Sequence, residues 1–294
     1  MLFPGIIPAA ITPFTADDAV DVPALRTNLE ALLSGGVTGL VATGTMGEAG
    51  QLADAERRTV VETCVAVAGG TIPVIVGVSA GSTAAACRNA AVAREAGAAA
   101  VMCLPPLNYK GTLGEFVAFY AAVGEAGGLP IMAYNNPEAS GIDLTPAVIA
   151  EIGAAVDAVV AVKECSGDAR RIAALVNDTD LEVLVGGDDW ALEGFATGAT
   201  GWVSGVANVA PAECVELHAH VAAGRLAEAR EIYRRLLPLA RLDMTPKLVQ
   251  YFKGSMDAVG LRGGSTRPPR LPLEEAEREV LHAAVAALRA PVAA

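Results

Sequence analysis

Short apolar runs alternate eight times with segments of helical length along this chain, and this alternation constrains its fold more than any other feature. The runs are continuously apolar rather than alternately apolar and polar, which is typical of parallel strands covered on both faces. We expect these strands at residues 5–13, 39–43, 74–79, 99–104, 130–134, 159–164, 181–185 and 200–204.

The segments between the runs carry helix start and stop signals. Asp54 and Glu56 lie in the first turn of one expected helix, and Gly35, Gly97 and Gly224 follow the ends of others. Repeated β/α units in one chain favour a closed (β/α)8 TIM barrel over the alternative of an open, doubly wound sheet. The helices are expected at residues 22–34, 53–68, 83–96, 112–125 and 211–222.

The length of the chain allows for more than the barrel. Its 294 residues exceed the roughly 250 that such a barrel needs. We therefore predict a barrel over residues 1–224 and a C-terminal helical extension over residues 225–294, with no linker between them. The extension should pack on the barrel or on another subunit. Its helices are expected at residues 226–237, 245–259 and 274–288.

Composition and charge argue against several kinds of partner. The formal net charge is −12 and the pI about 4.7, so neither nucleic acid nor an anionic membrane surface is expected to bind. No apolar run is suited to crossing a membrane, and the apolar start lacks the basic residues of a signal peptide. Five cysteines without a CxxC pair suit a reducing compartment, so we expect a cytoplasmic protein.

Lys163 is the unusual residue at the strand ends, where barrels of this kind carry their reactive groups. It follows the apolar residues Val159–Val162, in a strand from which lysine is normally excluded. On the same side as the small Ala161, it would point into the barrel mouth and lose hydration. Its pKa would then be lowered, which would leave a neutral amine as nucleophile. A lysine that reaches the rim or pairs with Glu164 is an equally open alternative.

The histidines argue against a metal-dependent reaction. His218, His220 and His282 all lie beyond the eighth expected strand, and the first two face different sides of a helix. We therefore expect neither a metal nor another cofactor. Cys165 is expected to fill space, because no histidine is placed to activate its thiol.

Other residues are expected around the same mouth. Tyr134 ends the fifth strand, where a tyrosine either transfers protons to the reacting carbon or packs as a rim aromatic. The turn Gly44–Glu48 offers backbone N–H groups and a hydroxyl to a substrate carboxylate. Asp189 is expected to cap the next helix. The expected substrate contacts are Gly44, Thr45, Met46 and Gly205.

Motifs at these strand ends give the chain a family resemblance over nearly its whole length. Residues 11–14 read Ile-Thr-Pro-Phe, and residues 44–48 read Gly-Thr-Met-Gly-Glu, similar to a GTTGE turn. Residues 134–137 read Tyr-Asn-Asn-Pro, a YNxP motif, and residues 162–164 read Val-Lys-Glu. Together they resemble the dihydrodipicolinate synthase/N-acetylneuraminate lyase family of Schiff-base barrels.

This resemblance implies roles for individual residues. In the family, the lysine of the KE motif forms the Schiff base, the YNxP tyrosine transfers protons, and the GTTGE turn holds the substrate carboxylate. Those roles would fall to Lys163, Tyr134, and Thr45 with its neighbours. The resemblance also implies a small 2-oxo acid as the substrate. Because family members are commonly tetramers, we expect a homotetramer as the assembly.

Three positions depart from the pattern of the lysine-pathway synthase in this family. Met46 stands where the synthase has a second threonine of its proton relay, and Leu107 stands near the relay tyrosine, with Tyr109 two residues on. Ala139 replaces the arginine that binds the carboxylate of the second substrate. The loss of such a charged contact costs more than about 1 kcal/mol of recognition, so synthase activity is not the first expectation.

The second half of the chain resembles a narrower branch. It is similar to bacterial 1-pyrroline-4-hydroxy-2-carboxylate deaminases at residues 163–168, 170–172, 188–189, 201–205 and 242–251. Lys163 would then open a cyclic imine, with loss of water and ammonia and release of 2,5-dioxopentanoate. We expect this activity first, then a pyruvate-dependent aldolase of a hydroxy-oxo acid, then 4-hydroxy-tetrahydrodipicolinate synthase. A non-catalytic barrel that senses an oxo acid and a metal-dependent barrel are the alternatives from other classes.

Overall fold

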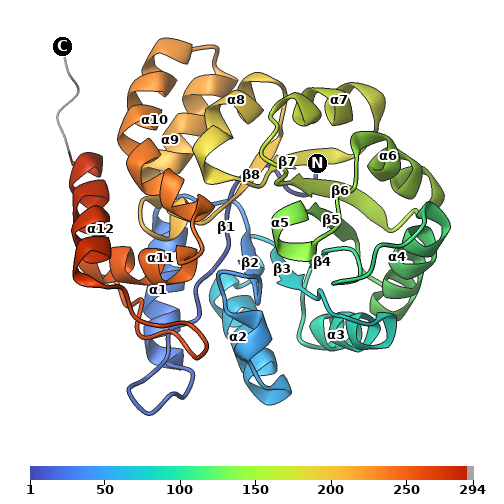
Figure 1. Ribbon diagram of the computed structural model, residues 1–294, viewed down its shortest axis with the longest axis horizontal. Helices are drawn as coiled ribbons and strands as arrows, with labels where there is room; N and C mark the ends of the chain where they lie inside the picture. Colours follow the sequence, from blue (N-terminus) through green and yellow to red (C-terminus); the bar gives the residue numbers. More distant parts are fainter. Residues whose placement is uncertain (290–294) are drawn as a thin grey trace.

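Eight parallel strands form the barrel wall in the computed structural model, which describes residues 1–289 (Figure 1). Each strand pairs with its neighbour in the order β1-β8-β7-β6-β5-β4-β3-β2, and a bridge between Ala9 and Val41 joins β1 to β2. The strands are β1 Gly5–Pro8, β2 Leu40–Ala42, β3 Val74–Gly77, β4 Ala100–Cys103, β5 Ile131–Asn135, β6 Val159–Glu164, β7 Glu182–Val185 and β8 Gly201–Ser204. The predicted TIM barrel is confirmed.

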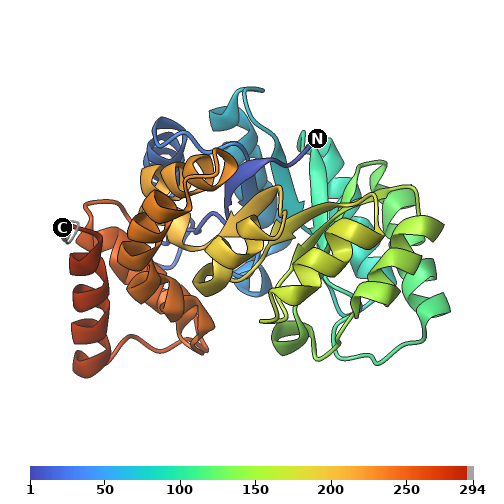
Figure 2. The same ribbon diagram turned by 90° about the horizontal axis from the view of Figure 1, so that it is seen from above.

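The helices cover the outside of this wall, as Figure 2 shows from above. Nearly all strand residues are buried, because side chains of one face fill the barrel and those of the other meet the helices. The helices are α1 Val22–Ser34, α2 Asp54–Ala68, α3 Thr83–Glu95, α4 Leu113–Gly127, α5 Pro137–Ser140, α6 Pro146–Ala155, α7 Arg170–Asp178, α8 Ala191–Ala196, α9 Pro211–Ala222, α10 Leu226–Ala240, α11 Leu248–Ala258 and α12 Glu275–Leu288. Short 3-10 turns are η1 Ala49–Gln51, η2 Asp188–Trp190, η3 Val206–Asn208 and η4 Arg241–Met244.

The first strand ends earlier than predicted. After Pro8 the backbone changes its hydrogen-bonding partner from β8 to β2. The Ala9 N–H still donates to the Ser204 carbonyl of β8, whereas the Ala10 N–H donates to the Val41 carbonyl of β2. This switch closes the barrel and releases the next residues from the ladder. The motif of residues 11–14 therefore follows β1 rather than belonging to it.

The last three helices lie at one side of the barrel (Figures 1 and 2). Helix α10 packs against α9, and α12 packs against both α10 and α11. The boundary predicted between residues 224 and 225 stays a prediction, and residues 290–294 lie outside the described part. No helix within residues 1–289 is both long and apolar enough to cross a membrane.

Candidate active site

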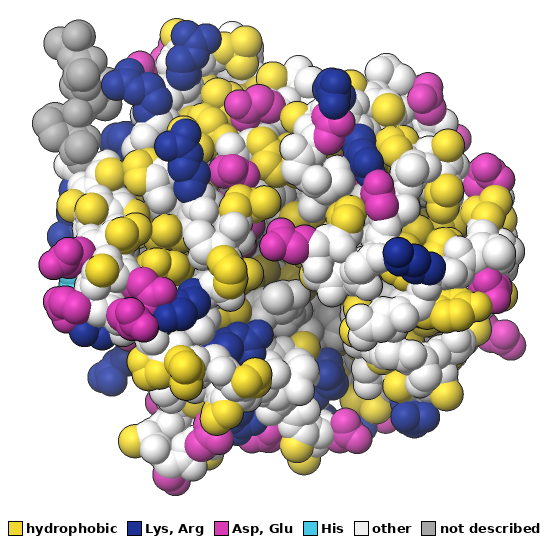
Figure 3. Space-filling view, viewed as in Figure 1, with side chains coloured by type: hydrophobic (Ala, Val, Ile, Leu, Met, Phe, Trp, Pro, Cys, Tyr) yellow, Lys and Arg dark blue, Asp and Glu magenta, His cyan; other side chains and the backbone are white. Residues whose placement is uncertain are grey.

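A cavity of about 180 Å³ opens at the C-terminal ends of the strands. Figure 3 shows this face of the molecule hollowed near its centre. Because the strands are parallel, the residues that follow each of them lie at this same end of the barrel. Positions distant in sequence therefore meet here. All six residues singled out from the sequence line the cavity: Gly44, Thr45, Met46, Tyr134, Lys163 and Gly205.

Lys163 lies deep in this cavity, on the inner side of β6. It pairs with Tyr134 in the ladder between β5 and β6, and its Nζ lies 4.2 Å from the centroid of the tyrosine ring. Both side chains are buried. Glu164 is held elsewhere, because its carboxylate accepts hydrogen bonds from Asn135 Nδ2 at 2.9 Å and from the backbone N–H of Ser166 at 2.7 Å. Lys163 is therefore neither at the rim nor paired with Glu164.

Burial and nearby groups act on the pKa of Lys163 in opposite directions. Burial lowers this pKa, whereas Tyr134, Cys165 and Asp243 raise it, and the net direction is upward. The expectation of a lowered pKa is therefore wrong, because it neglected the acidic groups around the amine. Tyr134 and Cys165 have pKa values raised to about 12 by burial and are neutral near pH 7. Asp243 is therefore the group that stabilises the charged form of Lys163 at that pH.

Tyr134 is held in place for hydrogen bonding. Its hydroxyl accepts a hydrogen bond from Asn136 Nδ2 at 2.9 Å. Asn136 is fixed in turn as the N-cap of α5, where its Oδ1 accepts from the backbone N–H of Ala139 at 2.9 Å. A phenol with a pKa of about 12 keeps its proton at neutral pH, so Tyr134 can donate a proton or relay one.

The Gly44–Glu48 turn is bounded by two residues in the left-handed region. Thr43 has φ 52° and Glu48 has φ 53°, a conformation that costs residues other than glycine about 1–3 kcal/mol each. The Glu48 N–H donates to the Thr45 carbonyl at 3.1 Å, and Thr12 Oγ1 donates to the Gly47 carbonyl at 2.9 Å. A tight, externally braced turn therefore presents Thr45 to the cavity.

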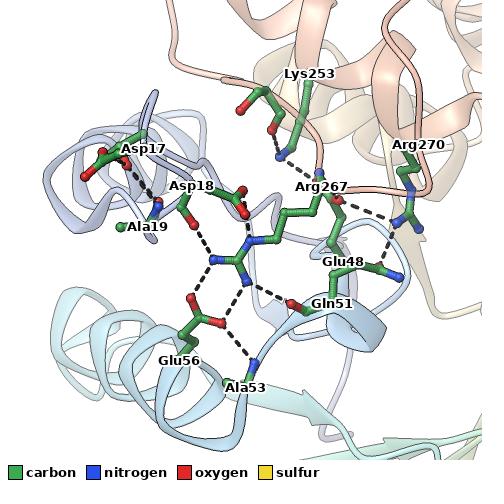
Figure 4. Close-up of polar contacts among 12 residues, drawn as sticks. Asp17, Asp18, Ala19, Glu48, Gln51, Ala53, Glu56, Lys253, Arg267 and Arg270 are labelled. Atoms are coloured by element: carbon green, nitrogen blue, oxygen red, sulfur yellow. Dashed lines mark hydrogen bonds and ion pairs between the residues drawn. The ribbon is translucent and has the colours of Figure 1, made fainter.

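The side chain of Glu48 is not among those that line the cavity, and it lies among residues of the C-terminal extension (Figure 4). Its Oε1 lies 2.6 Å from Lys253 Nζ of α11, and both side chains are almost fully buried. Its Oε2 accepts from the backbone N–H of Arg267 at 3.0 Å and lies 3.5 Å from Arg270 Nη1. We call Glu48 with these three partners the Glu48 anchor.

Arg267 extends the anchor to the beginning of the chain. Its guanidinium pairs with Glu56 of α2 and with Asp18, and donates to the Gln51 carbonyl at 2.8 Å (Figure 4). It also lies over the ring of Phe14, 4.2 Å from the ring centroid. Sequence reasoning missed the anchor. The available signal was Lys253 itself, a lysine beside apolar residues of a helix.

Asp188 is another buried carboxylate near the cavity. It accepts hydrogen bonds from Trp202 Nε1 at 2.9 Å, from the Gly205 N–H at 3.2 Å and from the Val206 N–H at 2.8 Å. It thereby fixes Gly205 at the cavity wall, where an added Cβ would lie 3.0 Å from Asp188 Oδ2. The cap expected from Asp189 is wrong, because Trp190 occupies the N-cap position of α8 and accepts no side-chain bond there.

Asp243 is a cavity residue that sequence reasoning did not single out. It belongs to η4, in the extension, and lines the cavity together with Lys163. Burial raises its pKa to about 6. Among the described residues that line the cavity, Lys163 is the only cation, whereas Glu138 and Asp243 are acidic.

Comparison with known proteins identifies the family of this barrel. Residues 2–288 match the model of the dihydrodipicolinate synthetase family. The chain belongs to that family. It is 33% identical over 283 residues to the 4-hydroxy-tetrahydrodipicolinate synthase of Methanococcoides burtonii, which covers 95% of this chain and 96% of the relative.

Solved structures of dihydrodipicolinate synthetase family members have the same architecture. A putative dihydrodipicolinate synthetase from Pseudomonas aeruginosa superimposes with a TM-score of 0.93 at 37% identity, over 98% of this chain and 100% of that one. YagE, a prophage protein of this family from E. coli K12 solved in complex with pyruvate, has a TM-score of 0.93 at 26% identity, over 98% and 99%.

Membership in the dihydrodipicolinate synthetase family decides the class of protein. Its members are lyases that act through a lysine Schiff base, so this chain is an enzyme of that kind rather than a sensor. The departures from the synthase pattern lie at or near the site. Met46 and Ala139 both line the cavity, whereas Leu107 lies in the loop before α4.

Proposed function

We propose that Lys163 is the residue that forms the Schiff base, with a small 2-oxo acid or a cyclic imino acid as substrate. The observation that carries this proposal is the buried Lys163 amine over the ring of Tyr134, in the cavity at the strand ends. A confined amine beside a proton-carrying hydroxyl suits attack on a carbonyl or imine carbon.

The geometry suggests how the other residues contribute. The turn that carries Gly44, Thr45 and Met46 would receive the substrate carboxylate through backbone N–H groups and the Thr45 hydroxyl. Tyr134 would supply the proton needed when the carbinolamine loses water, and would take a proton back from the attacking water on hydrolysis. Gly205 would leave room for the substrate, because a side chain there would meet Asp188 and Met46.

The charge of the cavity supports a substrate with one carboxylate. Ala139 offers no cation, and Glu138 and Asp243 would repel a second carboxylate. The 1-pyrroline-4-hydroxy-2-carboxylate deaminase reaction meets this condition. In it, Lys163 attacks C2 of the cyclic imine and the ring C2–N bond opens. The iminium accepts the electrons of the C3–H bond as the 4-hydroxyl leaves as water. Removal of a C5 proton and protonation at C3 and C4 then convert the freed C5 amine into an imine. Hydrolysis of this imine and of the Lys163 iminium releases ammonia and 2,5-dioxopentanoate. This is our specific proposal.

A second candidate is favoured by the relatives. The name of the Methanococcoides burtonii relative supports 4-hydroxy-tetrahydrodipicolinate synthase better than it supports the deaminase. The pyruvate bound to YagE agrees with any activity that begins with pyruvate, an aldolase of a hydroxy-oxo acid included. The synthase would need another group to bind the carboxylate of its second substrate.

A direct assay separates these candidates. The purified enzyme is given either the hydroxypyrroline carboxylate, with coupled detection of 2,5-dioxopentanoate, or pyruvate with aspartate semialdehyde. Turnover of the cyclic imine alone supports the deaminase, and its absence rejects that proposal. Ala139→Arg supplies the missing cation, so it should raise any synthase activity and lower deaminase activity. Release of pyruvate from a hydroxy-oxo acid would point to the aldolase.

The setting of the enzyme is also a proposal. The five cysteines are all free, which suits a reducing compartment such as the cytoplasm. We propose a homo-oligomer, with a tetramer as the expected form. Sedimentation velocity at several protein concentrations tests this, and a monomer at all of them would contradict it.

A further inference from the structure

Glu48 connects the carboxylate-binding turn to the C-terminal extension. Its backbone belongs to the turn, where its N–H donates to the Thr45 carbonyl at 3.1 Å. Its carboxylate belongs to the Glu48 anchor, 2.6 Å from Lys253 Nζ. The position of Thr45 therefore depends on a contact with a helix about two hundred residues later in the chain.

The turn needs such a brace because of its backbone conformation. Glu48 is a non-glycine residue with φ 53°, in the left-handed region where side chains are disfavoured. Residues of this kind persist when surrounding contacts determine their position. The buried ion pair with Lys253 and the hydrogen bond from the Arg267 N–H supply those contacts.

Lys253 is itself held firmly, which makes it a suitable brace. Its ammonium donates to the Ser265 carbonyl at 2.6 Å and lies 4.3 Å from the centroid of the Phe14 ring. Burial lowers its pKa, and Glu48 opposes that change. Because desolvation offsets much of the attraction, a buried ion pair is a weak device for stability alone. Its place behind the turn suggests a further role.

The pair also sets the charge behind the carboxylate-binding turn. An unpaired Glu48 carboxylate would place a buried negative charge three residues from Thr45, where the substrate carboxylate is to bind. Lys253, 2.6 Å away, supplies the nearest compensating charge, and Arg270 adds a second at 3.5 Å. The contact thus acts on both the shape and the electrostatic potential of the turn.

We propose that Lys253 is a positioning residue, which acts through Glu48 to keep the Gly44–Glu48 turn selective for a carboxylate. The inference rests on the proposed function, in which Lys163 forms the Schiff base and this turn receives the carboxylate. It assigns a role in substrate recognition to the C-terminal extension, although Lys253 itself does not line the cavity.

The test compares two ligands that differ in the carboxylate. Pyruvate and its neutral isostere pyruvamide are each incubated with the enzyme, and the Lys163 iminium is trapped with borohydride. Intact mass gives the rate of adduct formation for each ligand, and their ratio measures selectivity for the carboxylate. A loss of folded protein lowers both rates together and leaves this ratio unchanged.

Two variants of the anchor are compared with a matched control. Lys253→Met removes the nearest cation and leaves Glu48 with only the Arg267 N–H and the more distant Arg270. The double variant Glu48→Gln with Lys253→Met removes both buried charges and should fold where the single variant does not. Arg278→Gln breaks an exposed ion pair with Glu275 in α12, on the same extension, and should leave the ratio unchanged.

We expect the pyruvate to pyruvamide ratio to fall by roughly ten-fold or more in Lys253→Met, which loses both the brace and the nearest compensating charge. In the folded double variant, which lacks the brace but carries no buried carboxylate at position 48, the ratio should recover only in part. A wild-type ratio in the double variant would overturn the inference, as would a wild-type ratio in folded Lys253→Met. Failure of the wild-type enzyme to form any pyruvate adduct would instead overturn the proposed function, and this inference with it.

Discussion

Tyr134 and Lys163 are direct partners across the β5–β6 ladder, and the lysine Nζ lies 4.2 Å from the centroid of the tyrosine ring. Two regular strands therefore fix the distance between the proposed nucleophile and the proposed proton carrier. Side chains placed on strands are held more precisely than those on loops, which suits a reaction with several proton transfers at one carbon.

Lys163→Ala should abolish the adduct that borohydride traps with pyruvate, because it removes the proposed nucleophile. Intact mass before and after reduction provides the measurement. Lys110→Ala, at an exposed position outside the cavity lining, is the control and should retain the adduct. An adduct of wild-type yield in Lys163→Ala would assign the Schiff base to another lysine.

Tyr134→Phe should lower kcat by about 10²–10⁴-fold while changing KM little, because it deletes the proton carrier and keeps the ring. The ring contact with Lys163 is retained, so the pocket should keep its shape. Single-turnover measurements of adduct formation and breakdown would show both steps slowed. A variant with unchanged kcat would leave Tyr134 as a packing residue only.

Asp243→Asn should make Lys163 more reactive near neutral pH. The Asp243 carboxylate, with a pKa of about 6, is ionised at pH 7 and raises the pKa of Lys163. Without that charge the lysine pKa should fall, so the alkaline rise in adduct formation should move to lower pH. The rate of pyruvate trapping between pH 6 and 10 tests this, with the exposed Glu228→Gln as control. A profile that stays in place or moves to higher pH would contradict it.

Glu56→Gln should destabilise the protein at neutral pH but not in strong acid. Arg267 lowers the pKa of Glu56 from 4.5 to about 2. A lowered carboxyl pKa stabilises the folded state above the unfolded value of 4.5, and this contribution is lost as pH falls through about 2. Urea unfolding at several pH values measures the free energy of unfolding. The difference in this quantity between the variant and the wild type should shrink as the pH falls. Glu62→Gln, at an exposed position of the same helix, should change the free energy of unfolding little. A loss of stability in Glu56→Gln that is the same at every pH would argue against the ion pair.

The barrel could be predicted from the sequence because its signal is local. Each strand lies within or close to an apolar run, as in β6 at Val159–Glu164, and helix signals fill the intervals. Lys163 was detectable because a lysine interrupts such a run, and Tyr134 because its strand ends beside it. Topology then brought both to the same end of the barrel.

The missed features depend on contacts between distant parts of the chain. The Glu48 anchor joins residue 48 to residues 253, 267 and 270, and no local pattern reports that pairing. Asp243 enters the cavity from a 3-10 turn in the extension, not from a strand end. The error over the Lys163 pKa has the same origin, since Asp243 is one of the groups that raise it.

The bracing of the Gly44–Glu48 turn has a consequence for biosynthesis. The residues that secure this early loop are synthesised about two hundred residues after it, so a nascent chain can assemble the barrel wall before the Glu48–Lys253 ion pair forms. A product truncated before Lys253 would lack this ion pair even with every strand in place. Readiness to bind a carboxylate would then wait for synthesis of the extension, not of the strands alone.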